Sequence, residues 1–354
     1  MPGSAVLFAN DDKTVILIDG PRSIEEAQAH ARDLGSVPLR RLISTKPPDT
    51  PFATPEPKDH GGTLLQPASA QLAELMTGAA VSDALKLLKD QYAGPWCLSR
   101  MLPASTTSST GGKRKLPIAA DEAVHDPTVF IPEGSVYLSG TIESERATFV
   151  SKAPLFDLIL LDPPWPNRSA RRKKDGYSTA ESLSALRQTL SLIPVQAHLA
   201  PGGLIAIWIT NRASVSELLT SSRGILAEWG LETVDEWTWL KVTTAGEPLY
   251  RVDSRWRKPW ERLLIARRAG SQRKWSGQRK VIVSVPDVHS RKPNLRPLFD
   301  ELMPPSYTAL EVFARSLTAG WWSWGDEVLE FQRERHWVSD SVRETEDAIA
   351  DQNV

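Results

Sequence analysis

The 354-residue chain contains only one cysteine, Cys97. A single thiol cannot form an internal disulfide or a zinc site that needs two thiolates, so a disulfide scaffold is excluded and a reducing compartment is favoured. No stretch reaches the roughly 18 consecutive apolar residues of a membrane span, and the first residues lack the pattern of a secretory signal. We therefore expect an intracellular protein with no membrane partner.

The chain also has almost no net charge and lacks several common site motifs. Lys and Arg number 42 and Asp and Glu 43, which leaves −1. Binding to nucleic acid would therefore depend on local clusters of basic residues. The sequence lacks four motifs: G-x-G-x-x-G of dinucleotide-binding proteins, the phosphate-binding loop of nucleoside triphosphatases, G-x-S-x-G of serine hydrolases and H-E-x-x-H of zinc proteases. These four functions therefore lose support, and no metal is expected.

Composition and length indicate an ordinary globular protein with about two domains. Hydrophobic residues make up 41% and charged residues 24% of the chain. Residues 1–125 are predicted to be an accessory region with flexible linkers at about 44–63, which is rich in proline, and 103–117, which is rich in serine and glycine. Residues 126–338 are predicted to be the main domain, and the acidic tail 339–354 is predicted to be disordered.

Local signals predict a few elements in the N-terminal region. Two apolar runs within 5–18 flank Asn-Asp-Asp-Lys and predict a hairpin. Ser23 and Glu26 have the spacing of a capping box, which predicts a helix from there to about residue 34. Apolar residues at helical spacing predict a second helix over 69–92, interrupted near Gly78.

Continuous apolar, β-branched runs recur between helix-sized segments in the main domain. Runs of this kind are typical of strands covered on both faces, so we predict a largely parallel, Rossmann-like α/β sheet. The runs are FDLILL (156–161), GLIAIWIT (203–210), ERLLIAR (261–267), KVIVSVP (280–286) and TALEVFA (308–314).

Polar residues follow four of these runs. Ligands of open α/β sheets bind outside the carboxyl ends of the strands, so these residues are predicted to meet in one crevice. They are Asp162-Pro163-Pro164-Trp165, Asn211-Arg212, Asp287 with His289-Ser290-Arg291-Lys292-Pro293, and Arg315.

The tetrapeptide Asp162-Pro163-Pro164-Trp165 is the sharpest chemical signal. An amino group on an aromatic base is a poor nucleophile because its lone pair is delocalised into the ring. A carboxylate and a main-chain carbonyl that accept its two N–H groups would hold the nitrogen in a pyramidal geometry, and proline suits the carbonyl role because it has no N–H of its own. Trp165 offers a stacking face for the base. The structural alternative is an Asp capping a proline-rich turn above a buried Trp.

Several segments between about 156 and 335 together resemble the MT-A70-like adenine N6-methyltransferases, and within them the branch of methyltransferase-like protein 4. They are FDLILLDPPWPNRSARRKK, IAIWITNR, DEWTWLKVTTAGE, RKPWERLLIARR, KVIVSVPDVHSRKP and LEVFARSLTAGWWSWGDEVLEFQ. The resemblance implies a Rossmann-like methyltransferase domain, S-adenosylmethionine as the methyl donor without a metal, and adenine in nucleic acid as the acceptor.

The resemblance also implies roles for individual residues. Asp162 and the Pro163 carbonyl would hold the target amino group, Trp165 would help to enclose the base, and Lys292 would pair with the carboxylate of S-adenosylmethionine. The other implied cofactor residues lie under its ribose, at the ribose hydroxyls or near its adenine: Glu311, Arg315, Ser316, Asp326, Glu327 and Thr141. The family commonly has Asn at 316 and 326 and Asp at 141, so this chain departs from the pattern at those positions.

A basic segment directly after the tetrapeptide is predicted to contact phosphates of the substrate. Its residues are Asn167, Arg168, Arg171, Arg172, Lys173 and Lys174. A solvated charged surface is the alternative. Asn211 and a second group around Lys258 and Trp260 are further candidates for substrate binding, with tryptophan packed under basic side chains as the alternative.

These observations favour a methyltransferase acting on the exocyclic N6 amino group of adenine in DNA or small nuclear RNA, able to act without a partner subunit. The alternative is a catalytically weak methyltransferase-fold subunit that binds nucleic acid. The triplet Lys113-Arg114-Lys115 is either a nuclear-import signal or solvated surface. We expect a nuclear location and leave a cytoplasmic one open.

Overall fold

The structure is a computed structural model of the 354-residue chain. It describes residues 4–33, 40–53, 68–103, 128–166, 180, 182–254, 257–272, 275 and 277–338. Most of the predicted linker sequence and the whole predicted tail lie outside these residues.

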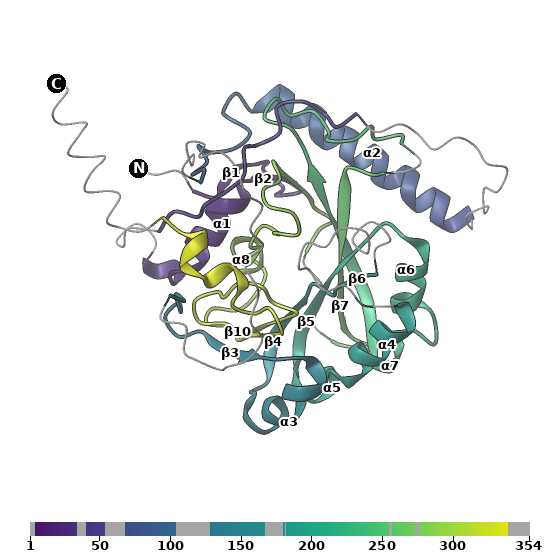
Figure 1. The fold of residues 1–354 in the computed structure, drawn as a ribbon. Helices are drawn as coiled ribbons and strands as arrows, with labels where there is room; N and C mark the ends of the chain where they lie inside the picture. Colours follow the sequence, from purple (N-terminus) through teal and green to yellow (C-terminus); the bar gives the residue numbers. More distant parts are fainter. Residues whose placement is uncertain are drawn as a thin grey trace, which may run out of the picture.

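Within the described residues, ten strands form one sheet in the order β1-β2-β8-β6-β7-β5-β4-β9-β10-β3 (Figure 1). The strands are β1 (Val6–Ala9), β2 (Val15–Ile18), β3 (Val136–Ser139), β4 (Phe156–Leu161), β5 (Leu199–Ile209), β6 (Leu231–Lys241), β7 (Trp260–Arg268), β8 (Val281–Ser284), β9 (Ala309–Val312) and β10 (Trp322–Gly325). The α-helices are α1 (Gly20–Ala27), α2 (Ala68–Gln91), α3 (Ile142–Lys152), α4 (Leu183–Leu192), α5 (Val195–His198), α6 (Ala213–Thr220), α7 (Ile225–Glu228) and α8 (Arg296–Phe299).

The sheet is mixed, with most neighbours parallel. β4 pairs in parallel with β5 and β9, and β8 pairs in parallel with β2 and β6. β7 runs antiparallel to both of its neighbours, β5 and β6. The predicted α/β class and its five strands are therefore confirmed. β1, the outermost strand, is also antiparallel to its neighbour β2, but apart from β7 the central strands run in one direction, which leaves their carboxyl ends at one edge.

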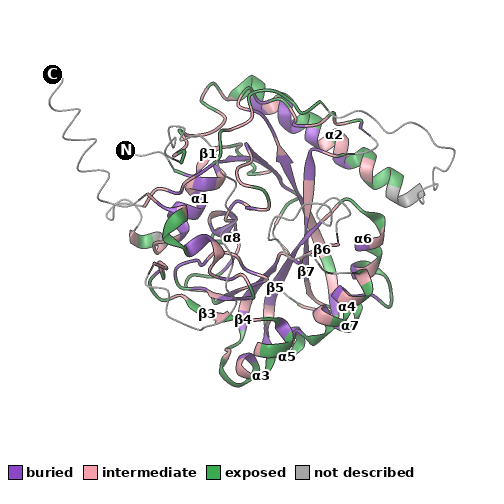
Figure 2. Ribbon diagram, in the orientation of Figure 1, coloured by how far each residue is buried: buried purple, intermediate pink, exposed green. Residues whose placement is uncertain are grey.

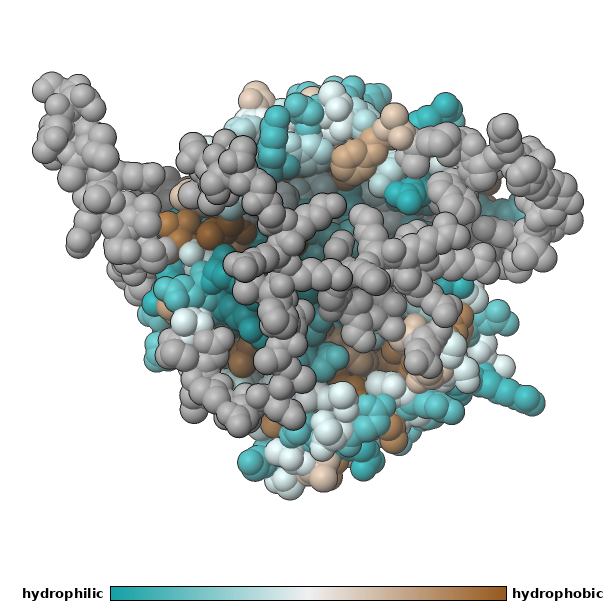
Figure 3. All heavy atoms as spheres, viewed as in Figure 1, coloured by the Kyte–Doolittle hydropathy of each residue, from teal (hydrophilic) through white to brown (hydrophobic). Residues whose placement is uncertain are grey.

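Helices cover both faces of the sheet. Along β4, Ile159 and Leu161 face a core shared with helices α3, α4, α6 and α7, whereas Leu158 and Leu160 face a second core that includes Phe299 of α8. This alternation explains why residues 158–161 of β4 are all apolar, since successive side chains point to opposite, equally dry faces. Buried residues lie mainly on the strands and on parts of the helices (Figure 2), and on the face seen in Figure 3 hydrophilic residues lie among scattered hydrophobic ones.

The predicted N-terminal hairpin is β1 with β2, and it joins the main sheet because β2 pairs in parallel with β8. Helix α2 packs on this part of the sheet through Val81, Leu85 and Leu88. It continues without a break through Gly78, contrary to the predicted interruption. The described part of residues 1–125 therefore contributes β1, β2, α1 and α2 to the body that carries the site.

The predicted capping box at Ser23 is wrong. Helix α1 begins at Gly20, its N-cap is Asp19, and it ends at Ala27. The Asp19 carboxylate accepts the backbone N–H of Arg22 at 2.9 Å, which satisfies one of the free donors at the start of the helix. Ser23 lies inside the helix and is 1% exposed.

Candidate active site

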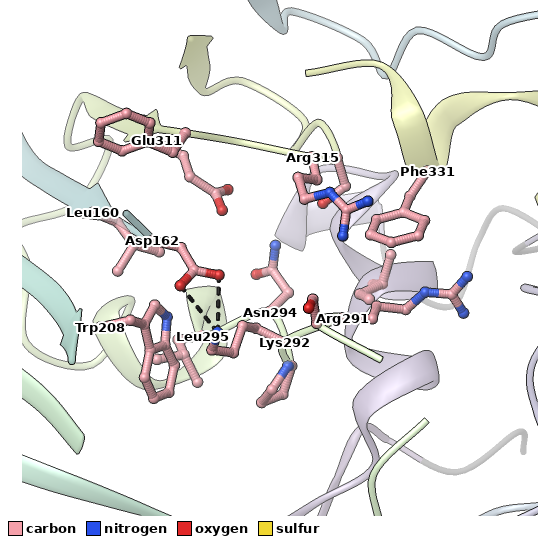
Figure 4. A pocket seen from close by; sticks show the side chains of 15 residues that line it. Leu160, Asp162, Trp208, Arg291, Lys292, Asn294, Leu295, Glu311, Arg315 and Phe331 are labelled. Atoms are coloured by element: carbon pink, nitrogen blue, oxygen red, sulfur yellow. Dashed lines mark hydrogen bonds and ion pairs between the residues drawn. The ribbon is translucent and has the colours of Figure 1, made fainter. Parts of the chain in front are cut away.

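A cavity lies at the carboxyl ends of β4, β5, β8 and β9 (Figure 4). Five residues predicted for catalysis or cofactor binding line it together, namely Asp162, Lys292, Glu311, Arg315 and Ser316. Its other walls are Ile24, Leu160, Trp208, Ser290, Arg291, Pro293, Asn294, Leu295, Phe313 and Phe331. The convergence of strand ends expected from the sequence is therefore what brings these side chains into one cavity.

Asp162 follows the last residue of β4 and forms an ion pair across the cavity. The Lys292 Nζ lies 3.0 Å from both carboxylate oxygens of Asp162. The same Nζ lies 3.3 Å from the carboxylate of Glu261, at the start of β7, and 5.5 Å from the ring centroid of Trp208. Lys292 is thus shared between the carboxylates of Asp162 and Glu261. It contacts both oxygens of Asp162, which would have to accept the hydrogen bonds of an incoming amino group.

Burial and neighbouring charges shift the pKa of each carboxyl group in this cluster. Burial raises the pKa of Asp162 despite the opposing effect of Lys292. Burial also raises the pKa of Glu311, and the Asp162 charge adds to this, so the pKa of Glu311 reaches about 8. For Glu261, burial acts in the same direction, but Lys241 and Lys292 outweigh it and lower the pKa to about 2. At neutral pH Glu261, which contacts Lys292 beside the cavity, is therefore charged, whereas Glu311 in the cavity wall is mostly protonated.

Glu311 and Arg315 come from β9 and the loop after it. The Glu311 carboxyl group points into the cavity opposite the Asp162–Lys292 pair (Figure 4). The Arg315 guanidinium lies 2.7 Å from the carboxylate of Glu327 and 4.6 Å from the ring centroid of Phe331. The predicted ribose residue Glu327 thus reaches the cavity wall through Arg315.

Two other predicted cofactor residues lie away from the cavity walls. Asp326 is exposed, and its carboxylate accepts the backbone N–H of Glu327 at 3.1 Å. Thr141 follows β3 and is the N-cap of α3, where its hydroxyl accepts the backbone N–H of Ser144 at 3.1 Å. The position of the Thr141 hydroxyl is therefore explained by its role as the N-cap of α3.

The turn after Asp162 is held by the main chain. The carbonyl of Pro163 accepts the backbone N–H of Trp165 at 2.8 Å, and a second lone pair on this oxygen remains for another donor. The Trp165 side chain is only 7% exposed, and its Nε1 donates to the carbonyl of Trp208 at 2.7 Å. Trp165 was expected to offer a stacking face to the base. Its indole is instead buried and forms a hydrogen bond that links the turn to β5.

The second group of predicted substrate residues stabilises the fold. The Asn211 side chain donates to the carbonyl of Trp260 at 2.5 Å and so joins the end of β5 to the start of β7. Lys258 forms an ion pair with Glu74 of α2 at 2.5 Å, and Trp260 is 3% exposed within the core. None of these residues is among the cavity walls, so the alternative of packed tryptophan under basic side chains describes Trp260 better.

The basic segment cannot be placed in the same way. All six of its predicted residues lie outside the described residues, namely Asn167, Arg168, Arg171, Arg172, Lys173 and Lys174. Their contact with substrate phosphates stays a prediction.

Sequence reasoning missed several walls of the cavity. Trp208 belongs to the apolar run of β5 and gave no signal of its own. Asn294 lies two residues after Lys292 and could have been included as its neighbour. Ile24 comes from α1 and lies more than 260 residues before Lys292 in the chain, so no local pattern could have assigned it to the cavity.

Comparison with known proteins gives the class that this fold and cavity define. The MT-A70 family pattern matches residues 156–327. The chain is 55% identical to the N6-methyladenosine RNA methyltransferase MTA1 of Cryphonectria parasitica, over 94% of each chain, and 48% identical to the protein of the same name from Pyricularia oryzae, over 95% of this chain and 96% of the other. It is 35% identical to the N(6)-adenine-specific methyltransferase METTL4 of Homo sapiens, over 52% of this chain and 40% of that one.

The chain therefore belongs to the MT-A70 family of adenine N6-methyltransferases, as the resemblance of its motifs implied. Methyltransferases of this family use S-adenosylmethionine. Two lining residues suit such a molecule, because Lys292 can bind its carboxylate and the Glu311 carboxyl group, which points into the cavity, can form a hydrogen bond with a hydroxyl. None of the described helices is long and apolar enough to cross a membrane.

Proposed function

We propose that this chain is an S-adenosylmethionine-dependent methyltransferase whose acceptor is the N6 amino group of adenine in RNA. The observation that carries the proposal is Asp162, which directly precedes Pro163 and lines a cavity that Lys292 and Glu311 also line. The choice of RNA is supported by the two relatives that this chain matches over nearly its whole length, both named as RNA methyltransferases. A relative from Caenorhabditis elegans named as a DNA methyltransferase is 36% identical over only 58% of this chain.

Catalysis in this proposal depends on orientation. S-adenosylmethionine, when bound, supplies an electrophilic methyl group on a sulfonium. Asp162 and the free lone pair of the Pro163 carbonyl accept the two N–H groups of the amine and hold its lone pair in line for attack. The Asp162 carboxylate could accept the proton that the amine loses on methylation, because burial raises the pKa of this group.

Lys292 has to release Asp162 before the amine can bind. Its Nζ contacts both oxygens of Asp162, and Glu261 offers a second, permanently charged partner 3.3 Å away. A cofactor carboxylate near Lys292 would draw the ammonium toward itself while Glu261 keeps it paired. This exchange would leave Asp162 free for the substrate only when the cofactor site is filled.

Methyl transfer to matched RNA and DNA oligonucleotides tests the proposal. We expect N6-methyladenosine in the digested RNA by mass spectrometry and a lower yield of N6-methyldeoxyadenosine from DNA of the same sequence. Binding of S-adenosylmethionine and RNA without any transfer would instead favour the alternative of a catalytically weak binding subunit. We also propose that the chain acts without a partner subunit and is nuclear, which the purified chain and a fluorescently tagged chain would test.

A further inference from the structure

Helix α1 lies between two loops that carry predicted cofactor residues. The loop after β8, residues 285–295, carries Lys292, and the loop after β9, residues 313–321, carries Arg315 and Ser316. Ile24 of α1 is itself one of the walls of the cavity. A helix near the N-terminus is therefore built into the site that the later part of the chain forms.

The contact between α1 and the loop after β8 is made through Asn294. The backbone N–H of Asn294 donates to the Ser23 hydroxyl at 2.8 Å. This hydroxyl donates in turn to the carbonyl of Gly20 at 2.6 Å, so its hydrogen is engaged and a lone pair faces Asn294. Ser23 is 1% exposed, so water cannot easily replace it as the partner of Asn294.

The contact with the loop after β9 uses the same asparagine. The side-chain amide of Asn294 donates to the Thr318 hydroxyl at 2.8 Å, and Thr318 is 0% exposed. The backbone N–H of Ala319 donates to the carbonyl of Ala27 at 2.8 Å. Asn294 and the end of α1 thus join the loop of Lys292 to the loop of Arg315.

Both loops contain a residue that needs such support. Ser290 has a φ of 67° and Phe313 a φ of 60°, and both line the cavity. L-residues rarely adopt this left-handed conformation unless the surrounding structure enforces it. We therefore expect these loops to shift, and Lys292 to move with its loop, if the contacts of Asn294 and Ala319 with α1 are lost.

We propose that α1 is part of the cofactor site and that Ser23 is a positioning residue, which acts through Asn294 to place Lys292. This inference rests on the proposed function, because it concerns the binding of S-adenosylmethionine. It predicts that a change in α1 alters cofactor affinity even where the changed residue contacts no cofactor atom.

The test compares Ser23→Ala with the parent chain by calorimetric titration with S-adenosylmethionine and by steady-state kinetics. Loss of one buried hydrogen bond predicts about three- to tenfold weaker binding and a matching rise in KM for S-adenosylmethionine. The kcat and the KM for RNA should stay within about twofold, because the loss affects ground state and transition state alike. Ser82→Ala is the control, since the Ser82 hydroxyl also donates to a helix carbonyl, that of Gly78, but lies in α2 away from the cavity.

Thr318→Val removes the second anchor of Asn294 and keeps the size of the side chain. It should weaken binding similarly, and its effect should not add to that of Ser23→Ala if both act through Asn294. Parental affinity for S-adenosylmethionine in a folded Ser23→Ala or Thr318→Val chain would overturn the inference. A parent chain that binds S-adenosylmethionine but methylates no RNA would contradict only the proposed function, because the binding comparison would still decide the role of Ser23.

Discussion

Replacing Glu311 with glutamine should stabilise the chain at pH 8 and have little effect at pH 5. The pKa of Glu311 is about 8 in the folded chain, because the group is buried and faces Asp162, against an ordinary value of 4.5. Between these two values the folded chain binds more protons at Glu311 than the unfolded chain, so its stability falls as the pH rises. Each pKa unit corresponds to about 1.4 kcal/mol, which sets an upper limit of about 5 kcal/mol above pH 8.

Solvent in the open cavity reduces this limit. We therefore expect the advantage of Glu311→Gln in free energy of unfolding to be about 2–3 kcal/mol larger at pH 8 than at pH 5. Urea denaturation at the two pH values measures it. Glu217→Gln on the exposed face of α6 is the matched control and should show no such difference. A difference of less than about 0.5 kcal/mol between the advantages at pH 8 and pH 5 would refute the reasoning, since ordinary surface substitutions change the free energy of unfolding by that much.

Three further predictions concern the cofactor, the turn and the basic segment. Lys292→Ala should weaken S-adenosylmethionine binding by about 1–3 kcal/mol, the usual value of a charge-assisted bond, and unchanged calorimetric affinity would remove it from the site. Trp165→Phe should lower the free energy of unfolding by about 1–3 kcal/mol because the carbonyl of Trp208 loses its donor; unchanged stability with a raised KM for RNA would favour the stacking face instead. Alanine at Arg171, Arg172, Lys173 and Lys174 should flatten the salt dependence of RNA binding by up to about 0.7 log unit per lost phosphate contact, and an unchanged slope would mean solvated surface.

The parallel strands were predictable because burial on both faces leaves a continuous apolar run. β4, for example, coincides with the run predicted over 156–161. β6 was missed because its sequence mixes acidic residues with tryptophan. β3 and β10 were missed because neither has a continuous apolar run: β3 is partly exposed, and serine and glycine alternate with tryptophan in β10. The orientation of β7 was not predictable either, since it follows from which neighbours it pairs with and not from its own composition.

The candidate site was predictable where a residue follows a strand directly or lies in the loop after it. Asp162 and Lys292 come from segments after β4 and β8, and the order of the strands brings them together. Lys258 was assigned to substrate from its charge, whereas the structure pairs it with Glu74, a contact made only when α2 packs on the sheet. The role of Ile24 likewise depends on a contact between distant parts of the chain, which local patterns do not encode.

The measurement that tests the account most directly is methyl transfer to an adenine-containing RNA by the parent chain and by Asp162→Ala. If Asp162 holds the amine mainly in the transition state, the variant should lose a factor on the order of 10²–10³ in kcat. Its affinity for S-adenosylmethionine should be equal to or tighter than that of the parent, because Lys292 no longer has Asp162 as a competing partner. A variant that methylates RNA at the parental rate, or a parent chain that binds both ligands without transfer, would contradict the account.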